Sequence, residues 1–113
     1  MRTEVLLNTV DASVQQIGAY QVDCGQDMRW LLMVTSSGLD GTPQLFLEES
    51  SDNTNWVALE NYADGLNHWL VDDPLIHIRD SYFMGKSFRV RVEANGNTTG
   101  TIYAELVVKT KSN

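Results

Sequence analysis

The sequence predicts an all-β fold: a single antiparallel β-sandwich of about eight to nine short strands, with jelly-roll-like or immunoglobulin-like topology. Apolar and polar residues alternate with a period of two along most of the chain, as in strands with one buried and one solvated face. Segments rich in Gly, Asn, Asp and Pro separate these stretches. No window supports a helix longer than a turn or two. The 113 residues suit one domain, spanning 1–113.

The expected strands are short runs of apolar, aromatic and β-branched residues bounded by turn residues. They cover residues 3–7, 14–22, 28–35, 44–49, 56–59, 68–71, 75–79, 87–93 and 101–109. Gly18 interrupts the second run, and we interpret it as a β-bulge. The first run is expected to add to the sheet edge of a neighbouring subunit.

The last two expected strands have the clearest alternation. Phe88, Val90 and Val92 share one face of the first, and the second alternates in the same way. Between them lies the dipeptide Asn95-Gly96, a strong turn signal because both residues tolerate positive φ. The pattern predicts a β-hairpin made of these two strands.

The polar stretch Ser50–Asn55 is predicted to be a turn, capped by Asp and Asn side chains. Trp56 would then fold back over the hairpin and cover the edge of the core. A calcium loop fails the EF-hand pattern, because Thr54 and Trp56 stand where acids are needed.

Asp64, Asp72 and Asp73 offer carboxylates for a looser metal site, but solvated loop acids are the simpler interpretation. A zinc site needs about four Cys or His ligands, and the three scattered candidates do not make one. We therefore expect no metal and no cofactor.

Composition limits the partners. The chain has 8 basic and 15 acidic residues and a net charge of −7, the opposite sign to that of most nucleic-acid binders, so direct binding of nucleic acid is not expected. No apolar run approaches the ~20 residues of a membrane span, and the polar N-terminus does not resemble a secretory signal. The single Cys24 cannot form an internal disulfide and is expected to be a small buried hydrophobic residue.

No catalytic template fits the sequence. His68 and His77 are the only histidines, and neither serine pair has the Gly-x-Ser-x-Gly motif of a hydrolase. We therefore expect that the protein is not an enzyme. Asn97 begins an Asn-Thr-Thr glycosylation sequon, a pattern that often occurs by chance.

Surface residues are the remaining candidates for function. Residues 30–34 are apolar on both faces, so Leu31 and Met33 would be left outside the core. They are the candidate contacts with another subunit, and the alternative is that a loop of the same chain packs over them. Tyr103 is outward on its strand and joins this candidate interface. Arg89 and Arg91 form a basic stripe that either meets an acidic partner or pairs across strands within the molecule.

Tryptophan and tyrosine side chains also serve as platforms on which sugar rings stack. Trp56, Tyr62 and Trp69 lie in or beside expected loops and are the candidate glycan contacts.

Two stretches within residues 44–111 resemble known proteins. The stretch LEESSDNTNW resembles the Ser-x-Asp-x-x-x-Trp hairpin of many small phage virion proteins and of discoidin-like carbohydrate-binding sandwiches. The stretch FRVRVEANGNTTGTIYAELVVKTK is similar to the closing hairpin of the phage group, with its Gly-Asn-x-Thr-Gly turn. The chain lacks the disulfide cysteines and the length of discoidin-like modules.

The resemblance implies a capsid, decoration, head-tail or tail component of a tailed bacteriophage. We therefore expect a non-enzymatic structural subunit of a virion, made in the host cytoplasm, that forms homo-oligomers and docks onto other virion proteins. The alternative is a carbohydrate-binding or adhesin-type module.

Overall fold

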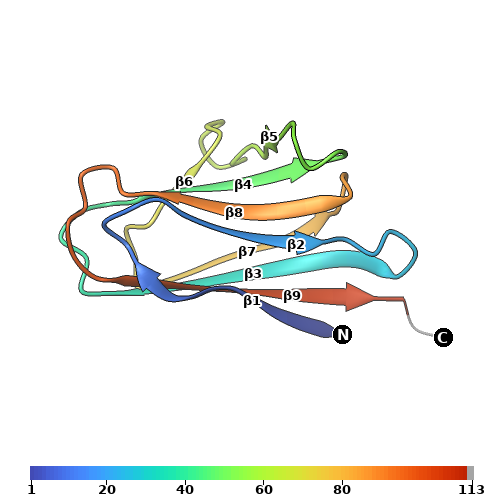
Figure 1. The fold of residues 1–113 in the computed structure, drawn as a ribbon, viewed down its shortest axis with the longest axis horizontal. Helices are drawn as coiled ribbons and strands as arrows, with labels where there is room; N and C mark the ends of the chain where they lie inside the picture. The colour runs from blue at the N-terminus through green and yellow to red at the C-terminus, as the bar shows by residue number, and fades with distance from the viewer. Residues whose placement is uncertain (112–113) are drawn as a thin grey trace.

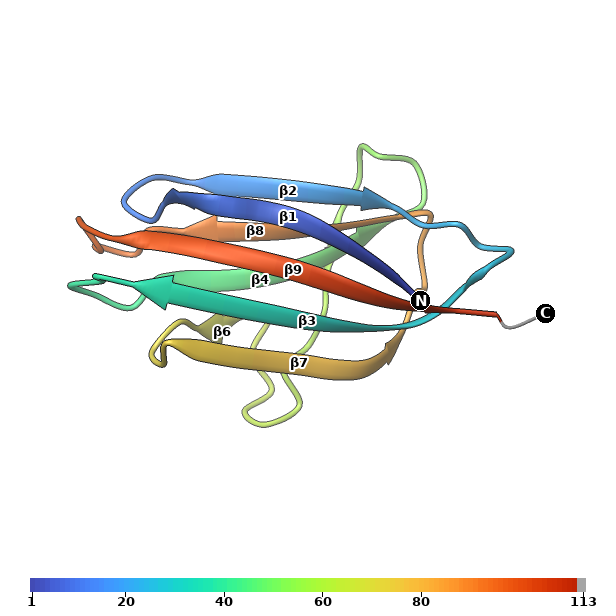
Figure 2. The ribbon, with the colours of Figure 1, turned by 90° about the horizontal axis from the view of Figure 1, so that it is seen from below.

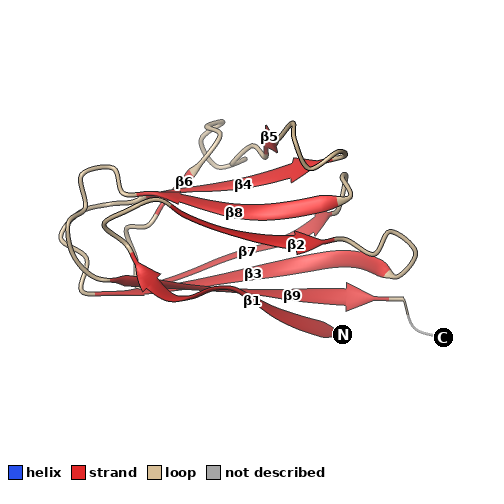
Figure 3. Ribbon diagram, in the orientation of Figure 1, coloured by secondary structure: helices blue, strands red, loops and turns tan. Residues whose placement is uncertain are grey.

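The computed structural model describes residues 1–111, and for Asp80 and Ser81 only the backbone. Nine strands run through this part of the chain: β1 (Arg2–Asp11), β2 (Gln16–Gln21), β3 (Asp27–Ser37), β4 (Gln44–Ser50), β5 (Val57–Ala58), β6 (Trp69–Leu70), β7 (Leu75–Tyr82), β8 (Ser87–Glu93) and β9 (Thr101–Thr110). All other described residues form loops and turns (Figure 3). The all-β prediction is confirmed.

The strands form two packed antiparallel sheets (Figures 1 and 2). Sheet A has the order β1-β9-β3-β7, and sheet B has the order β2-β8-β4-β5, with β6 also paired to β4. The pairs β1–β9, β2–β8 and β3–β7 are nested around β4 and its partners β5 and β6. A long two-armed hairpin folded over itself gives this arrangement, which is a jelly roll and not an immunoglobulin-like sandwich.

The core lies between the sheets and is made by alternate residues of the long strands. Phe88, Val90 and Val92 of β8 are fully buried, as their alternation predicted. Trp30 of β3 packs against Phe88, with ring centroids 4.9 Å apart. The buried hydrophobic residues are Leu7, Ala12, Tyr20, Trp30, Leu32, Val34, Leu45, Leu47, Val71, Phe88, Val90, Val92, Ile102, Ala104, Leu106 and Val108.

The hairpin predicted for β8 and β9 is wrong. The turn forms as expected, with positive φ at Asn95 and Gly96, but β8 belongs to sheet B and β9 to sheet A. The connection crosses from one sheet to the other, and β9 pairs with β1 and β3. A local turn signal reverses the chain direction but does not determine which sheet the next strand joins, because that depends on long-range pairing.

The expectation for Gly18 needs correction, whereas the addition of residues 3–7 to a neighbouring sheet stays a prediction. Residues 3–7 are part of β1, which pairs with β9 of its own molecule and forms an edge of sheet A. Gly18 makes no bulge, since the β2–β8 register is continuous around it. A Cβ at Gly18 would lie 2.1 Å from the carbonyl oxygen of Leu6, so this glycine lets β1 approach β2 and closes that side of the sandwich.

The buried Asn97 side chain fixes the crossover between β8 and β9. Its Oδ1 accepts hydrogen bonds from the backbone N–H groups of Asp40 (3.0 Å) and Gly41 (2.9 Å). Its Nδ2 donates to the carbonyl oxygens of Ala12 (3.0 Å) and Thr99 (2.7 Å). One amide thus joins three loops at one end of the jelly roll. Because both amide hydrogens are engaged and the residue is 2% exposed, the sequon cannot be glycosylated in the folded chain.

We predict that Asn97→Ala lowers the free energy of unfolding by about 2–4 kcal/mol, because it leaves buried backbone groups of three loops without partners. Urea unfolding monitored by tryptophan fluorescence measures the change. Asn95→Gly is the control: it removes one exposed bond, to Thr42, at a positive φ that glycine adopts readily, and should change stability by less than about 1 kcal/mol. Equal losses in the two variants would contradict the role given to Asn97.

Candidate interaction surfaces

The structure does not bring the five predicted interface residues together. Leu31, Met33 and Tyr103 lie on the outward face of sheet A, whereas Arg89 and Arg91 lie on the outward face of sheet B. The separation follows from the crossover, because outward residues of β8 and β9 point to opposite sides of the sandwich.

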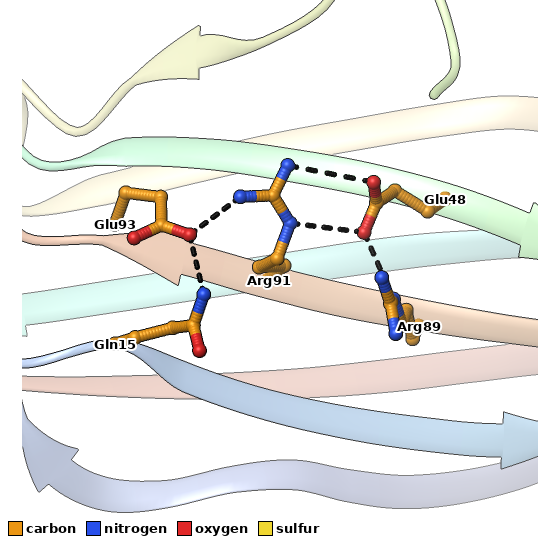
Figure 4. Close-up of polar contacts among 5 residues, drawn as sticks. All are labelled: Gln15, Glu48, Arg89, Arg91 and Glu93. Carbon is orange, nitrogen blue, oxygen red and sulfur yellow. Dashed lines mark hydrogen bonds and ion pairs between the residues drawn. The ribbon is translucent and has the colours of Figure 1, made fainter. Parts of the chain in front are cut away.

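On sheet B, Arg89 and Arg91 pair with acidic residues of the same molecule (Figure 4). Oε1 of the nearly buried Glu48 on β4 lies 2.8 Å from Nε of Arg89 and 3.1 Å from Nε of Arg91. Arg91 also contacts Glu93 at 2.5 Å, and Glu93 accepts a 2.6 Å bond from Gln15. Of the two alternatives for Arg89 and Arg91, pairing across strands within the molecule is therefore the one observed.

Aromatic rings cover the same two guanidinium groups. The Arg89 guanidinium lies 4.2 Å from the ring centroid of Trp56, and that of Arg91 lies 4.0 Å from the centroid of Phe46. Trp56 thus covers the outward face of sheet B and not the edge of the core, contrary to expectation. A tryptophan can leave the core here because stacking on a cation that is already paired shields both groups from water.

The electrostatics agree with a self-contained network. Burial alone lowers the pKa of Arg91, but its bonds to Glu48 and Glu93 outweigh burial and raise the pKa above its ordinary value. The hydrogen bond from Gln15, followed by the contact with Arg91, lowers the pKa of Glu93. The charges of this face are satisfied within the molecule.

The outward face of sheet A is different in character. We call the residues Val5, Leu31, Met33, Leu75, Tyr103 and Val107 the sheet A patch. Leu31 is opposite Val107, and Thr35 separates Tyr103 from Leu75 in the register. Val5 is 47% and Leu75 46% exposed, while Leu31 and Met33 are half-buried by their strand neighbours. The patch is therefore not covered by any described part of the chain.

Basic residues gather at one end of the sheet A patch. Arg29, Arg79 and Lys109 line a shallow groove of about 290 Å³, whose wall includes Leu31 and Val107. The only acid that the register places beside the patch on the central strands is Glu105, opposite Met33. The sequence offered no signal for this cluster, because its members come from three strands whose register is set by long-range pairing.

The three candidate glycan contacts are also divided. Tyr62 and Trp69 line one pocket of about 410 Å³ at the side of the sandwich where β7 forms the edge of sheet A. Trp56 lies on the outward face of sheet B. Sequence reasoning missed Arg79 and Tyr82, which line the same pocket from β7.

The loop at Ser50–Asn55 is a capped turn between β4 and β5, as predicted. Asp52 accepts hydrogen bonds from the backbone N–H of Thr54 (2.9 Å) and Asn55 (2.8 Å) and from the Asn55 side chain (2.8 Å). These bonds, with the Asn55 N–H contributing most, hold the pKa of the Asp52 carboxyl well below its usual range. Among the side chains that the structure describes, which exclude Asp80 and Ser81, no group of three or more His, Cys, Asp or Glu is placed to hold a metal ion.

The residues with reactive side chains are scattered. Cys24 lies exposed in the turn between β2 and β3, so the expectation of a buried cysteine is wrong; the turn contributes no residue to the core. His77 is exposed on β7, and the ring of His68 lies beside Phe46, with centroids 5.4 Å apart.

Glu49 is an inward-facing acid at the end of β4 and is 6% exposed. Its Oε1 accepts hydrogen bonds from the backbone N–H of Met84 (2.8 Å) and Gly85 (3.4 Å), which ties down the connection between β7 and β8. Burial raises the pKa of Glu49, and the two backbone bonds offset only part of this effect.

Comparisons with protein families, with curated proteins and with solved structures gave no match for this chain. The described residues contain no helix of the length and apolar character that crossing a membrane requires.

We predict that Glu48→Gln lowers the free energy of unfolding by about 2–3 kcal/mol, because it leaves two neighbouring guanidinium groups without their shared anion. Glu93→Gln is the matched control, since the side chain of Glu93 is 32% exposed and its loss should change stability by about 1 kcal/mol or less. Urea unfolding at neutral pH compares the two. If the Glu48→Gln protein were as stable as the Glu93→Gln protein, Glu48 would not have the stabilising role of a shared anion for Arg89 and Arg91.

A second prediction concerns Glu49→Gln. The unfolded carboxyl titrates near 4.5 and the folded one at higher pH, so between these values the native state binds more protons and stability falls as the pH rises. The glutamine side chain of the variant does not titrate in this pH range. As the pH rises from the unfolded to the folded pKa of Glu49, we therefore expect the parent protein to lose unfolding free energy relative to Glu49→Gln. A difference that stays constant with pH would contradict the burial cost assigned to Glu49.

Proposed function

We propose that this protein is a non-enzymatic structural subunit of a virus particle, which acts by self-association and by docking onto other virion proteins. Jelly rolls build viral capsids and also lectins, so the fold is compatible with this role without selecting it. The resemblance of residues 44–111 to small phage virion proteins supports the same role. The observation that carries the proposal is the exposed sheet A patch.

The centres of the two outward faces of the sandwich differ in polarity. A two-layer sandwich buries only one face of each sheet, so the outward faces are usually polar. The centre of sheet B conforms, because its aromatic rings cover ion pairs of the same molecule, although Ile17, Val57 and Leu70 are exposed on its edge strands. Sheet A leaves Val5 and Leu75 nearly half exposed beside Leu31 and Met33. Association would remove this apolar surface from water.

Charge favours a second copy of this chain as the occupant. The patch is bordered by Arg29, Arg79 and Lys109, although the whole molecule has a net charge of −7. The acidic surface of another copy is therefore complementary to it, whereas the same patch would repel itself. Asp72 and Asp73 are exposed just before β7 and are suitable partners. A contact between different surfaces is heterologous, and such contacts generate rings or open lattices.

Sedimentation velocity on the full chain tests this proposal. We predict an oligomer for the parent protein and a monomer for Leu31→Glu/Met33→Glu, because the two carboxylates would replace apolar surface in an interface of about 1,000 Å² or more and would repel the acidic surface of the second copy. Raising the salt concentration should also weaken association. Val57→Glu is the control: Val57 is 70% exposed on β5 of sheet B, and its variant should remain oligomeric. A parent protein that stays monomeric at high concentration, or a Val57→Glu effect equal to that of the patch variant, would refute the proposal.

A further inference from the structure

The jelly roll is closed along one side and open along the other. The close approach of Leu6 to Gly18 brings β1 and β2 together on the first side. On the second side, β7 ends sheet A while the short strands β5 and β6 end sheet B. The loop between β5 and β6 extends past β7 (Figure 2). A pocket of about 410 Å³ lies there, within the size range of small-molecule sites.

Four aromatic side chains line this pocket. Trp30 comes from β3, Trp69 from β6, Tyr82 from β7 and Tyr62 from the loop between β5 and β6. The polar lining includes Glu60 and Arg79, which carry opposite charges. Aliphatic side chains complete the wall. The pocket therefore combines several ring faces with a few polar groups.

The most exposed of these rings stands on a fixed backbone. Tyr62 is 91% exposed, yet its neighbour Asn61 is buried and organises the loop. The Asn61 N–H donates to the carbonyl oxygen of Leu66 (2.7 Å), and the Asn61 carbonyl oxygen accepts from Gly65 (2.8 Å). The Asn61 side-chain oxygen accepts from the Ala63 N–H (3.1 Å). An exposed ring on an ordered loop loses little conformational entropy when a ligand binds.

A second ring is held in place by a cation. The hydroxyl of Tyr82 accepts a 2.6 Å hydrogen bond from Arg29, whose guanidinium lies 5.0 Å from the centroid of the ring. Tyr82 is still 57% exposed. Tyr62 and Tyr82 thus present two exposed tyrosine rings to the same pocket, of which the ring of Tyr82 is held by Arg29.

The buried wall of the pocket contains an unsatisfied donor. The indole Nε1 of Trp30 is buried and has no hydrogen-bond partner among the described residues. Such groups are rare in folded proteins, and each costs about 1–3 kcal/mol. Because Trp30 also lines the pocket, a ligand there would lie against the residue that carries this donor.

From this lining we propose that the pocket binds a neutral mono- or disaccharide. A sugar ring has apolar C–H faces that pack on aromatic rings and hydroxyl groups that both donate and accept hydrogen bonds. Arg79 supplies donors, the Glu60 carboxylate supplies acceptors, and their opposite charges favour an uncharged ligand. A purely apolar ligand would remove water from both charged groups and would offer no hydrogen bonds in place of those that the groups make to water. The proposal does not rest on self-association, although Arg79 belongs both to this pocket and to the basic border of the sheet A patch. A sugar site on a virion subunit would add attachment to glycans.

Titration of the full-length protein with methyl glycosides of glucose, galactose, mannose and N-acetylglucosamine tests this site. Tryptophan fluorescence and calorimetry report binding, because Trp30 and Trp69 both line the pocket. We expect saturable binding of at least one glycoside and a loss of affinity of roughly tenfold in Tyr62→Ala. Trp56→Ala is the control, since Trp56 stacks on Arg89 outside the pocket, and it should bind like the parent. Melting temperatures confirm that both variants are folded.

Three results would overturn the proposal: no saturable binding of any of the four glycosides, an affinity that Tyr62→Ala leaves unchanged, or a larger loss in Trp56→Ala than in Tyr62→Ala. Toluene serves as an apolar aromatic probe. Binding of toluene without binding of any glycoside would identify a purely apolar pocket and would also contradict a saccharide site. Saturable glycoside binding by a parent protein that stays monomeric would support this site and refute self-association, so failure of one proposal is distinguishable from failure of the other.

Discussion

Apart from β4, β5 and β6, which share sheet B, consecutive strands alternate between the two sheets, and the rest of the structure depends on this constraint. It sends the chain from β8 in sheet B to β9 in sheet A, through a crossover fixed by the buried Asn97 amide. As a result, the outward residues of β8 and β9 face opposite sides of the molecule. One side is closed by Arg89, Arg91 and their acidic partners, and the other presents the sheet A patch.

Local pattern predicted the core well and the pairing poorly. Alternation identified Phe88, Val90 and Val92 as buried, because a strand with one dry face imposes a period of two whichever sheet it joins. The capped turn at Asp52 was predictable for the same reason, since its hydrogen bonds lie within a few residues. The shared partner of Arg89 and Arg91 was not predictable in this way. Glu48 is more than forty positions distant from both arginines and reaches them only through the β4–β8 register.

The same limit applies to the pocket at the open side of the sandwich. Tyr62 and Trp69 were identified as exposed aromatic candidates, but their grouping with Arg79 and Tyr82 depends on where the edge of sheet A lies relative to sheet B. Trp56 was grouped with them because it is close in sequence, and the structure places it over Arg89. Composition can indicate that a surface is rich in aromatic residues, whereas only the topology shows which of them share a site.

Amide hydrogen exchange on dilute and concentrated protein tests most directly the claim that the patch-bearing sheet faces a partner. If copies associate through the sheet A patch, exchange should slow with concentration in the edge strands β1 and β7, where amides not engaged in the ladder lie beside the contact, and should stay unchanged in β2. Protection that appears in β2 instead, or that does not depend on concentration in any strand, would contradict the account.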